Sequence, residues 1–311
     1  MKNSFVVPVH DMVYLIDRST EQRSVMVQKK NKNHPAWLIK AYDNPDFLHS
    51  APARPIRVLA ELIEPVSRLK KHKLYDTVVF FGSARTLPRD TALKNLRGIE
   101  KKIRGTGSAP AKLRSDLANA RRELVMSRYY EDALKLSEKL TRWFDLPEHS
   151  GRRFIVCSGG GPGIMEAANR GAQKAGGQSI GLNISLPLEQ YPNIHQTKEL
   201  SFEFHYFFIR KFWFFYPAKA LIVFPGGYGT LDELFELLTL VQTKKTQKYM
   251  PIILYGRKYW KEVLNFDAMI KWGAISKSDL DLFKIFDNVD AAFEYLKTEL
   301  TAHYLIKPKR T

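Results

Sequence analysis

Two strand–loop–helix–strand units, each built around a glycine-rich loop, constrain the fold of this chain more than any other feature. In each unit a short apolar strand ends in the loop, a helix follows directly, and a second apolar strand comes next. The elements are strand 154–157, loop 158–163, helix 164–175 and strand 179–184, then strand 219–224, loop 225–230, helix 231–243 and strand 251–255. Strands that alternate with helices predict an α/β fold, a Rossmann-like, doubly wound and mostly parallel sheet with helices on both faces.

The remaining segments extend this core at both ends. A β-branched and aromatic run at 77–81 predicts a buried strand that opens the sheet. The patterns at 89–104 and 111–140 predict two helices, separated by a break at 105–110 that is rich in glycine and ends in proline. The pattern at 287–300 predicts a closing helix. We therefore expect an N-terminal basic extension over 1–75 and a Rossmann-like domain over 76–311 with a helical insert at 89–128.

The positive charge is concentrated in the extension and the insert. The chain has 49 Lys and Arg against 32 Asp and Glu, a net charge of +17. Residues 1–75 carry 13 basic and 7 acidic residues, and 84–128 carry 12 and 4, so these two segments hold +6 and +8. This balance indicates an anionic partner, either a phosphorylated small molecule or a nucleic acid. The alternative is that the basic helices form a solvated face.

The cysteine count and the hydropathy pattern indicate the compartment. A single cysteine, Cys157, excludes an intramolecular disulfide and favours a reducing compartment such as the cytoplasm. Because Cys157 ends a buried strand, we expect an inert core thiol. The N-terminus lacks the pattern of a signal peptide, and the apolar stretch 202–224 is interrupted by charged residues and a proline, so we expect no membrane span.

Three loops are expected to meet at one edge of the sheet. In a doubly wound sheet the carboxyl ends of the strands line a crevice, which places 82–85, 158–163 and 225–230 together. Glycines let backbone amides approach a ligand, and the start of a helix favours an anion such as phosphate. The glycines alternatively serve only to turn the chain tightly. No triphosphate-binding loop occurs, and Glu166 stands where a dinucleotide fingerprint requires glycine.

Several candidate residues allow a structural as well as a functional interpretation. Thr230 and Glu233 match a capping box, with Thr230 at the N-cap; alternatively a phosphate occupies the helix start and Glu233 faces the crevice. Arg210 either extends from an aromatic helix to water or serves the site. His205 is a possible proton donor, although a lone histidine among aromatics is more often structural.

The residues 225–233, Pro-Gly-Gly-Tyr-Gly-Thr-Leu-Asp-Glu, resemble the hallmark of the LOG family of cytokinin-activating and nucleotide 5′-monophosphate nucleosidases, often mislabelled as lysine decarboxylases. Phe-Gly-Ser-Ala-Arg at 81–85, the glycine loop and helix start at 158–169, and the pair Arg210-Lys211 also resemble the family. The resemblance extends over about 76–255. The N-terminal segment and the insert depart from compact plant members, so cytokinin specificity does not carry over.

The resemblance implies hydrolysis of the N-glycosidic bond of a nucleoside 5′-monophosphate to a free base and ribose 5-phosphate, with Glu233 and Arg210 catalytic. The substrate-binding residues that it implies are Gly82, Ser83, Arg85, Gly160, Gly161, Gly163, Glu166, Lys211, Gly226, Gly227, Gly229 and Thr230. It implies no metal and no cofactor, and a homodimer or larger homo-oligomer. The alternative is a non-catalytic protein that senses a nucleotide, or associates with nucleic acid, through the same crevice.

Overall fold

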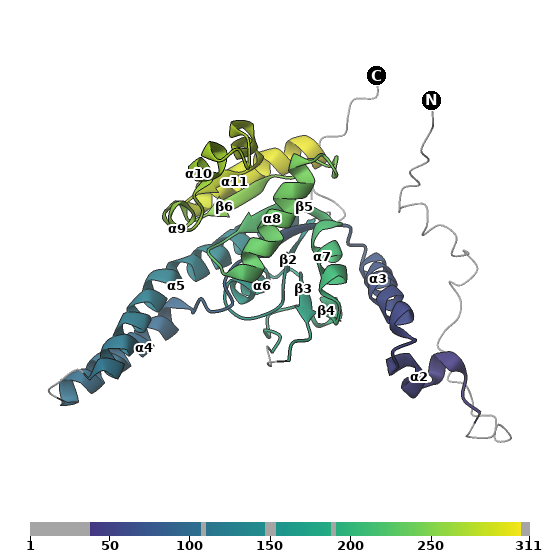
Figure 1. The fold of residues 1–311 in the computed structure, drawn as a ribbon, viewed down its shortest axis with the longest axis horizontal. Coiled ribbons are helices and arrows are strands. Elements are labelled where there is room, and N and C mark those ends of the chain that lie inside the picture. The colour runs from purple at the N-terminus through teal and green to yellow at the C-terminus, as the bar shows by residue number, and fades with distance from the viewer. Residues whose placement is uncertain (1–37, 107–109, 147–153, 188–190, 306–311) are drawn as a thin grey trace. The chain divides into compact units, whose positions relative to one another are not determined.

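The computed structural model describes residues 38–106, 110–146, 154–187 and 191–305 (Figure 1). The chain divides into two compact units, Met1–Ile56 and Arg57–Thr311. The described part of the first unit contains the short helices η2 (Ala41–Asp43) and α2 (Pro45–His49), and the Asn44 side chain caps α2 by accepting the Phe47 amide.

The second unit is built on a seven-stranded sheet in which every pairing is parallel. Its order is β4-β3-β2-β1-β5-β6-β7. The strands are β1 (Asp76–Phe81), β2 (Phe154–Ser158), β3 (Ser179–Ile184), β4 (Ser201–Phe204), β5 (Ala218–Val223), β6 (Ile252–Tyr255) and β7 (Lys284–Phe286). This confirms the predicted fold class. The strand order reverses at the neighbouring strands β1 and β5: β2, β3 and β4 follow β1 on one side, and β6 and β7 follow β5 on the other. Doubly wound folds bind their ligands at such a point.

Helices cover both faces of the sheet (Figure 1). The helices from α3 onward are α3 (Arg54–Lys71), α4 (Arg89–Thr106), α5 (Ala111–Phe144), α6 (Ile164–Lys174), α7 (Phe207–Phe215), α8 (Tyr228–Gln242), α9 (Arg257–Val263), α10 (Phe266–Lys271) and α11 (Val289–Leu300), of which α4 does not pack on the sheet. On β1, Val78 and Phe80 pack in the core with α5, α6 and α11, whereas Val79 and Phe81 pack in the core with α7 and α8. Both faces of β1 are therefore buried, which explains why its sequence is continuously apolar.

The single cysteine lies in the core as predicted. Cys157 is 1% exposed and packs on the α7 and α8 side of the sheet. Burial raises the pKa of its thiol far above the usual range, because the thiolate has no water to stabilise it. The expectation of an inert core thiol is confirmed.

The insert forms the predicted hairpin of two helices. Helix α4 packs against the first half of α5 and lies away from the sheet (Figure 1). From Tyr130 onward α5 turns buried residues such as Leu136 and Leu140 towards the sheet. The second half of this long helix therefore anchors the hairpin to the core.

Helix α3 is joined to the sheet unit by hydrogen bonds. The Glu61 carboxylate accepts the amides of His205 (2.8 Å) and Tyr206 (3.2 Å), and the Glu61 carbonyl accepts the Trp213 indole N–H (3.0 Å). Residues 57–75, which the sequence assigns to the N-terminal extension, thus lie in the same compact unit as the sheet. Within the described ranges, no helix combines the length and apolar character needed to cross a membrane.

Candidate active site

A cavity of about 670 Å³ opens at the carboxyl ends of the central strands, where the sequence predicts the site. All three predicted loops contribute to its wall. The lining residues are Phe81, Gly82, Ser83, Ala84, Arg85, Met126, Gly159, Met165, Ile184, Leu186, Phe207, Arg210, Gly226, Gly227, Tyr228, Gly229, Thr230, Leu231, Asp232, Glu233 and Tyr259. Most of the residues expected from the first and third loops therefore share one cavity with both catalytic candidates.

Helix α8 begins at Tyr228, three residues earlier than predicted, and this overturns the capping-box interpretation. Its N-cap is Gly227, which supplies no side-chain cap, so Thr230 lies in the first turn and cannot be the N-cap. The Leu231 amide makes the first bond of the helix, to the Gly227 carbonyl (3.0 Å). The preceding amides have no partner within the helix, so the helix start can receive an anion.

Glu233 lies one turn further along α8 as a buried carboxylate. Its side chain is only 5% exposed, and within the described residues its Oε2 atom has no hydrogen-bond partner. Burial raises the pKa of Glu233 to about 7, while the charges of Arg210 and Lys211 act in the opposite direction. A carboxyl group that changes protonation near neutral pH in a cavity is suited to proton transfer.

Arg210 is fixed inside the site, so the hypothesis that it extends to water is wrong. Its Nε donates to the Leu182 carbonyl (2.7 Å) and its Nη2 to the Gly159 carbonyl (3.3 Å), while the guanidinium lies 4.9 Å from the Phe214 ring centre. Burial lowers the pKa of Arg210 to about 10, which still leaves it charged at neutral pH. These two carbonyls, one within β3 and one directly after β2, hold the cation beside the cavity.

The first glycine loop packs closely on the second. The Ile164 amide donates to the Ser83 carbonyl (3.1 Å), and Gly163 has a φ of 71°. A Cβ at Gly163 would collide with that same carbonyl, so glycine is required there. Arg85 is exposed at the rim, and its amide donates to the Ser83 hydroxyl (3.1 Å).

The second loop contributes less to the cavity than predicted. Gly159 lines it, but Gly160, Gly161, Gly163 and Glu166 do not. The loop instead accepts hydrogen bonds from a later segment of the chain that contains Asn193 and Gln196.

Two side chains of that segment hold the loop. The Asn193 amide side chain donates to the carbonyls of Gly160 and Gly161 (2.9 Å each), and the Gln196 side chain donates to Gly160 (2.8 Å). Glu166 accepts the Tyr130 hydroxyl (2.6 Å). The carbonyls of Gly160 and Gly161 and the Glu166 carboxylate are therefore bonded within the protein, and the geometry does not support the predicted contact of these residues with substrate.

Lys211 lies outside the cavity. Its ammonium group forms ion pairs with Asp232 (2.8 Å) and Glu236 (2.7 Å) on α8. The structure therefore gives Lys211 a supporting position rather than the predicted contact with substrate. His205 is exposed, packs its ring on Tyr206 and does not line the cavity, in agreement with the structural interpretation.

Sequence reasoning missed residues that reach the site from distant elements. Met126 comes from the insert helix α5 and Phe207 from the start of α7, and with Ile184 they form an apolar wall. The Tyr259 hydroxyl on α9 donates to the Gly226 carbonyl (2.6 Å) and so fixes the third loop. No local pattern around these residues distinguishes them from ordinary core positions.

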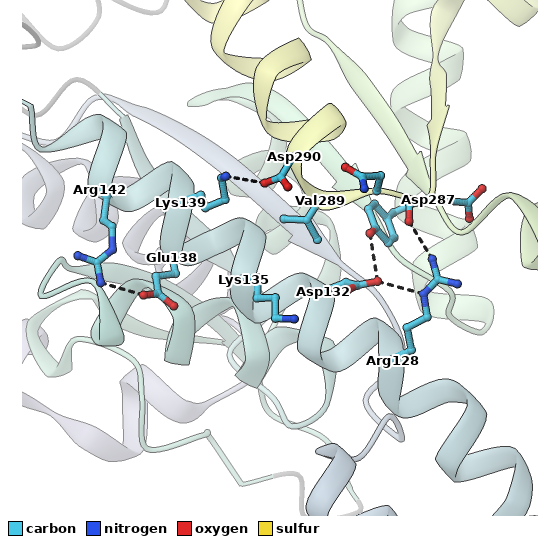
Figure 2. Close-up of a pocket in the computed structure, with 11 residues that line it drawn as sticks. Arg128, Asp132, Lys135, Glu138, Lys139, Arg142, Asp287, Val289 and Asp290 are labelled. Atoms are coloured by element: carbon cyan, nitrogen blue, oxygen red, sulfur yellow. Dashed lines mark hydrogen bonds and ion pairs between the residues drawn. The ribbon is translucent and has the colours of Figure 1, made fainter.

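A second cavity, of about 450 Å³, lies between α5 and the start of α11 (Figure 2). Its charged side chains face one another: Arg128 pairs with Asp132 (3.3 Å) and Lys139 with Asp290 (2.6 Å). No glycine loop and no unpartnered buried carboxylate lines it. Among the described residues no group of His, Cys, Asp and Glu is arranged to hold a metal ion. The first cavity is therefore the candidate active site.

Comparison with known proteins finds similarity to one family over part of the site region. Residues 165–296 match the family model described as "Possible lysine decarboxylase", a range that includes Arg210 and Glu233. A rice protein (Oryza sativa subsp. japonica), named "Probable cytokinin riboside 5'-monophosphate phosphoribohydrolase LOGL5", is 28% identical over 135 residues. The match covers 39% of this chain and 49% of the rice protein, so the chain spans about half the length of that curated relative.

Solved structures with a similar arrangement include TM1055 and the molybdenum cofactor carrier protein of Chlamydomonas reinhardtii. Each is 16% identical, with TM-scores of 0.41 and 0.39. The matches cover 72% and 73% of this chain and 99% of each of those chains.

Proposed function

We propose that the chain is a member of the LOG family and hydrolyses the N-glycosidic bond of a nucleoside 5′-monophosphate to a free base and ribose 5-phosphate, as its similarity to the family model and to the rice relative suggests. The observation that carries this proposal is Glu233, a buried carboxylate with an unpartnered oxygen in the wall of the cavity. Its position one turn from the start of α8 places an acidic group close to a ready anion site.

The start of α8 is suited to hold the 5′-phosphate. Gly227 and Gly229 are exposed and leave the backbone accessible, and the first-turn amides together with the positive end of the helix dipole favour a dianion. The Thr230 hydroxyl adds a further donor in the same turn. A phosphate bound here directs the ribose ring towards Glu233.

The chemistry is the displacement of the base by water. The water oxygen bonds to C1′ of the ribose while the C1′–N bond breaks and its electron pair leaves with the base. The ionised Glu233 stabilises the positive charge that develops on the sugar and accepts a proton from the water. An equivalent proton passes, directly or through solvent, to the departing base, and Glu233 returns to its ionised form. Arg210 supports this step by opposing the rise in the pKa of Glu233.

The substrate class that we propose is a purine or pyrimidine monophosphate. The apolar wall of Met126, Ile184 and Phe207 offers a surface for a planar base. Because Met126 belongs to the insert, the preference for a particular base is a property of this chain and is not transferred from the rice relative.

Decarboxylation of lysine is not supported by the residues of the cavity. Lysine decarboxylases that use pyridoxal phosphate require a lysine to form a Schiff base. Among the described residues that line this cavity there are two arginines and no lysine.

The proposal is tested by incubating the purified protein with AMP, GMP, IMP, CMP and UMP and separating the released bases by chromatography. We expect release of base and an equal amount of ribose 5-phosphate from at least one of them. The corresponding nucleoside without phosphate should have a kcat/KM at least about 100-fold lower, because it lacks the phosphate that the start of α8 would bind. Tight binding of a monophosphate without release of base would instead support the non-catalytic alternative.

We also propose that the chain forms a homodimer or a larger homo-oligomer. Phe207 and Phe208 at the start of α7 are 52% and 55% exposed, and Leu59 and Ile63 on neighbouring α3 are 54% and 56% exposed. Such an apolar surface favours burial against a second copy. Light scattering should give at least twice the chain mass of 35.9 kDa; a mass of one chain would contradict the proposal.

A further inference from the structure

The outward face of helix α4 carries a row of basic side chains. Lys94, Arg97, Lys101 and Arg104, here called the α4 basic stripe, follow one another at intervals of three, four and three residues. This spacing places them on one side of a helix. The residues at 92, 96, 99 and 103, which are buried or half-buried, lie on the opposite side, where α4 packs on α5. The stripe therefore points away from the protein.

The charges of the stripe are not neutralised by the rest of the described chain. All four side chains are exposed, and none of them forms an ion pair or a hydrogen bond with another described residue. The described helix has two carboxylates, Asp90 in the first turn and the half-buried Glu100 beside Arg104, against the four cations of the stripe. Three of the four cations that line the second cavity, Arg128, Lys139 and Arg142, are in contrast paired with carboxylates (Figure 2).

We propose that the α4 basic stripe binds the phosphate backbone of a nucleic acid. The stripe is about 15 Å long, since ten residues separate its ends and each adds about 1.5 Å. A row of cations that repeats about every 5 Å along a convex helix suits an extended polyanion better than a single nucleotide, which needs a concave site.

Two further features favour nucleic acid over a membrane surface. Insertion into a membrane interface requires large apolar side chains beside the cations, and the outward face of α4 offers none among its described residues. Gly98 lies beside the stripe, and a Cβ there would meet no protein atom within 4 Å. A glycine in mid-helix that no packing requires leaves room for a strand to approach the backbone closely.

The test compares two variants that change the net charge equally. The first replaces Lys94, Arg97, Lys101 and Arg104 by Glu. The matched control replaces Lys198, Lys245, Lys258 and Lys271 by Glu, because these lysines are exposed on other elements. Binding of fluorescein-labelled single-stranded RNA of about 20 nucleotides, and of duplex DNA of about 20 base pairs, is followed by anisotropy between about 50 and 300 mM KCl.

We expect the wild type and the control to bind at least one probe with a slope of log affinity against log salt of about −3, as four phosphate contacts require. The stripe variant should bind at least about tenfold more weakly at 100 mM KCl, with a slope close to zero. The better-bound probe identifies RNA or DNA as the partner.

Three outcomes would overturn the proposal: no binding of either probe by the wild type at 50 mM KCl, an equal loss in both variants, or, in a parallel sedimentation assay, binding only to vesicles that contain phosphatidylserine. Circular dichroism verifies that both variants fold. Because the stripe lies outside the cavity, base release from monophosphates should be the same in the stripe variant and the wild type, and the result is independent of whether the protein is a nucleosidase.

Discussion

Replacement of Glu233 by Gln should lower kcat/KM for hydrolysis of a nucleoside 5′-monophosphate by about 10³-fold or more. The amide keeps the size of the carboxyl group but can neither accept a proton from water nor stabilise a positive sugar. Release of base from the best substrate of the panel gives the measurement. Substrate affinity should change little, because we propose that backbone amides, and not Glu233, hold the phosphate.

The matched control for this variant is Glu236→Gln. Glu236 lies nearly one turn further along α8, pairs with Lys211 (2.7 Å) and does not line the cavity. Its replacement should leave kcat/KM within about threefold of the wild type, since surface ion pairs contribute little. Equal activities of Glu233→Gln and the wild type would remove Glu233 from the mechanism.

The same Glu233→Gln variant should be more stable than the wild type above neutral pH. Burial raises the pKa of Glu233 from 4.5 to about 7, so the folded state binds the proton more tightly than the unfolded state. The free energy of unfolding is therefore highest below pH 4.5 as far as this group is concerned, falls as the pH rises to about 7, and then stays constant.

The glutamine side chain of the variant does not titrate, so the variant does not lose this part of its free energy of unfolding as the pH rises. At pH 8 its free energy of unfolding should exceed that of the wild type by about 2–3 kcal/mol, and at pH 4 the two should agree. Urea unfolding at the two pH values measures the difference. A gain in stability together with a loss of activity would show that the buried Glu233 carboxylate destabilises the fold but is needed for activity. A loss of both would indicate a structural role.

The sequence predicts the fold well because the strongest patterns lie in the centre of the sheet. The strand 179–184 is found with the predicted bounds, and the central strands agree within one residue. The edge strands β4 and β7 were not predicted. Each has only three or four residues, and such a segment acquires its strand geometry from pairing with the neighbouring strand rather than from its own sequence.

The site was predicted less completely, for two physical reasons. The spacing of Thr230 and Glu233 fits a capping box as well as a catalytic turn, and only the backbone at Gly227 determines where the helix begins. The second loop looks like a ligand cradle in sequence, but Asn193 and Gln196, which follow it by about 30 residues, bond to its carbonyls. Such tertiary contacts leave no local pattern.

The position of Arg210 beside Glu233 leads to a prediction that separates its charge from its hydrogen bonds. Arg210→Lys keeps a positive charge but cannot reach both the Leu182 and Gly159 carbonyls in the same way, whereas Arg210→Gln loses the charge as well. Both variants should lower kcat/KM by about 10²-fold, because the cation no longer holds the site in its productive geometry.

The pH profile distinguishes the two variants. In the wild type, kcat/KM should rise with pH as Glu233 ionises, with an apparent pKa near 7. Arg210→Lys should keep this value, whereas Arg210→Gln should move it upward, because the charge that favours the carboxylate is gone. Lys211→Gln is the matched control: its ammonium is already paired with two carboxylates, so its removal should shift the profile less. An unchanged apparent pKa in Arg210→Gln would show that the guanidinium does not act on Glu233 through its charge, and would limit Arg210 to holding the carbonyl ends of β2 and β3.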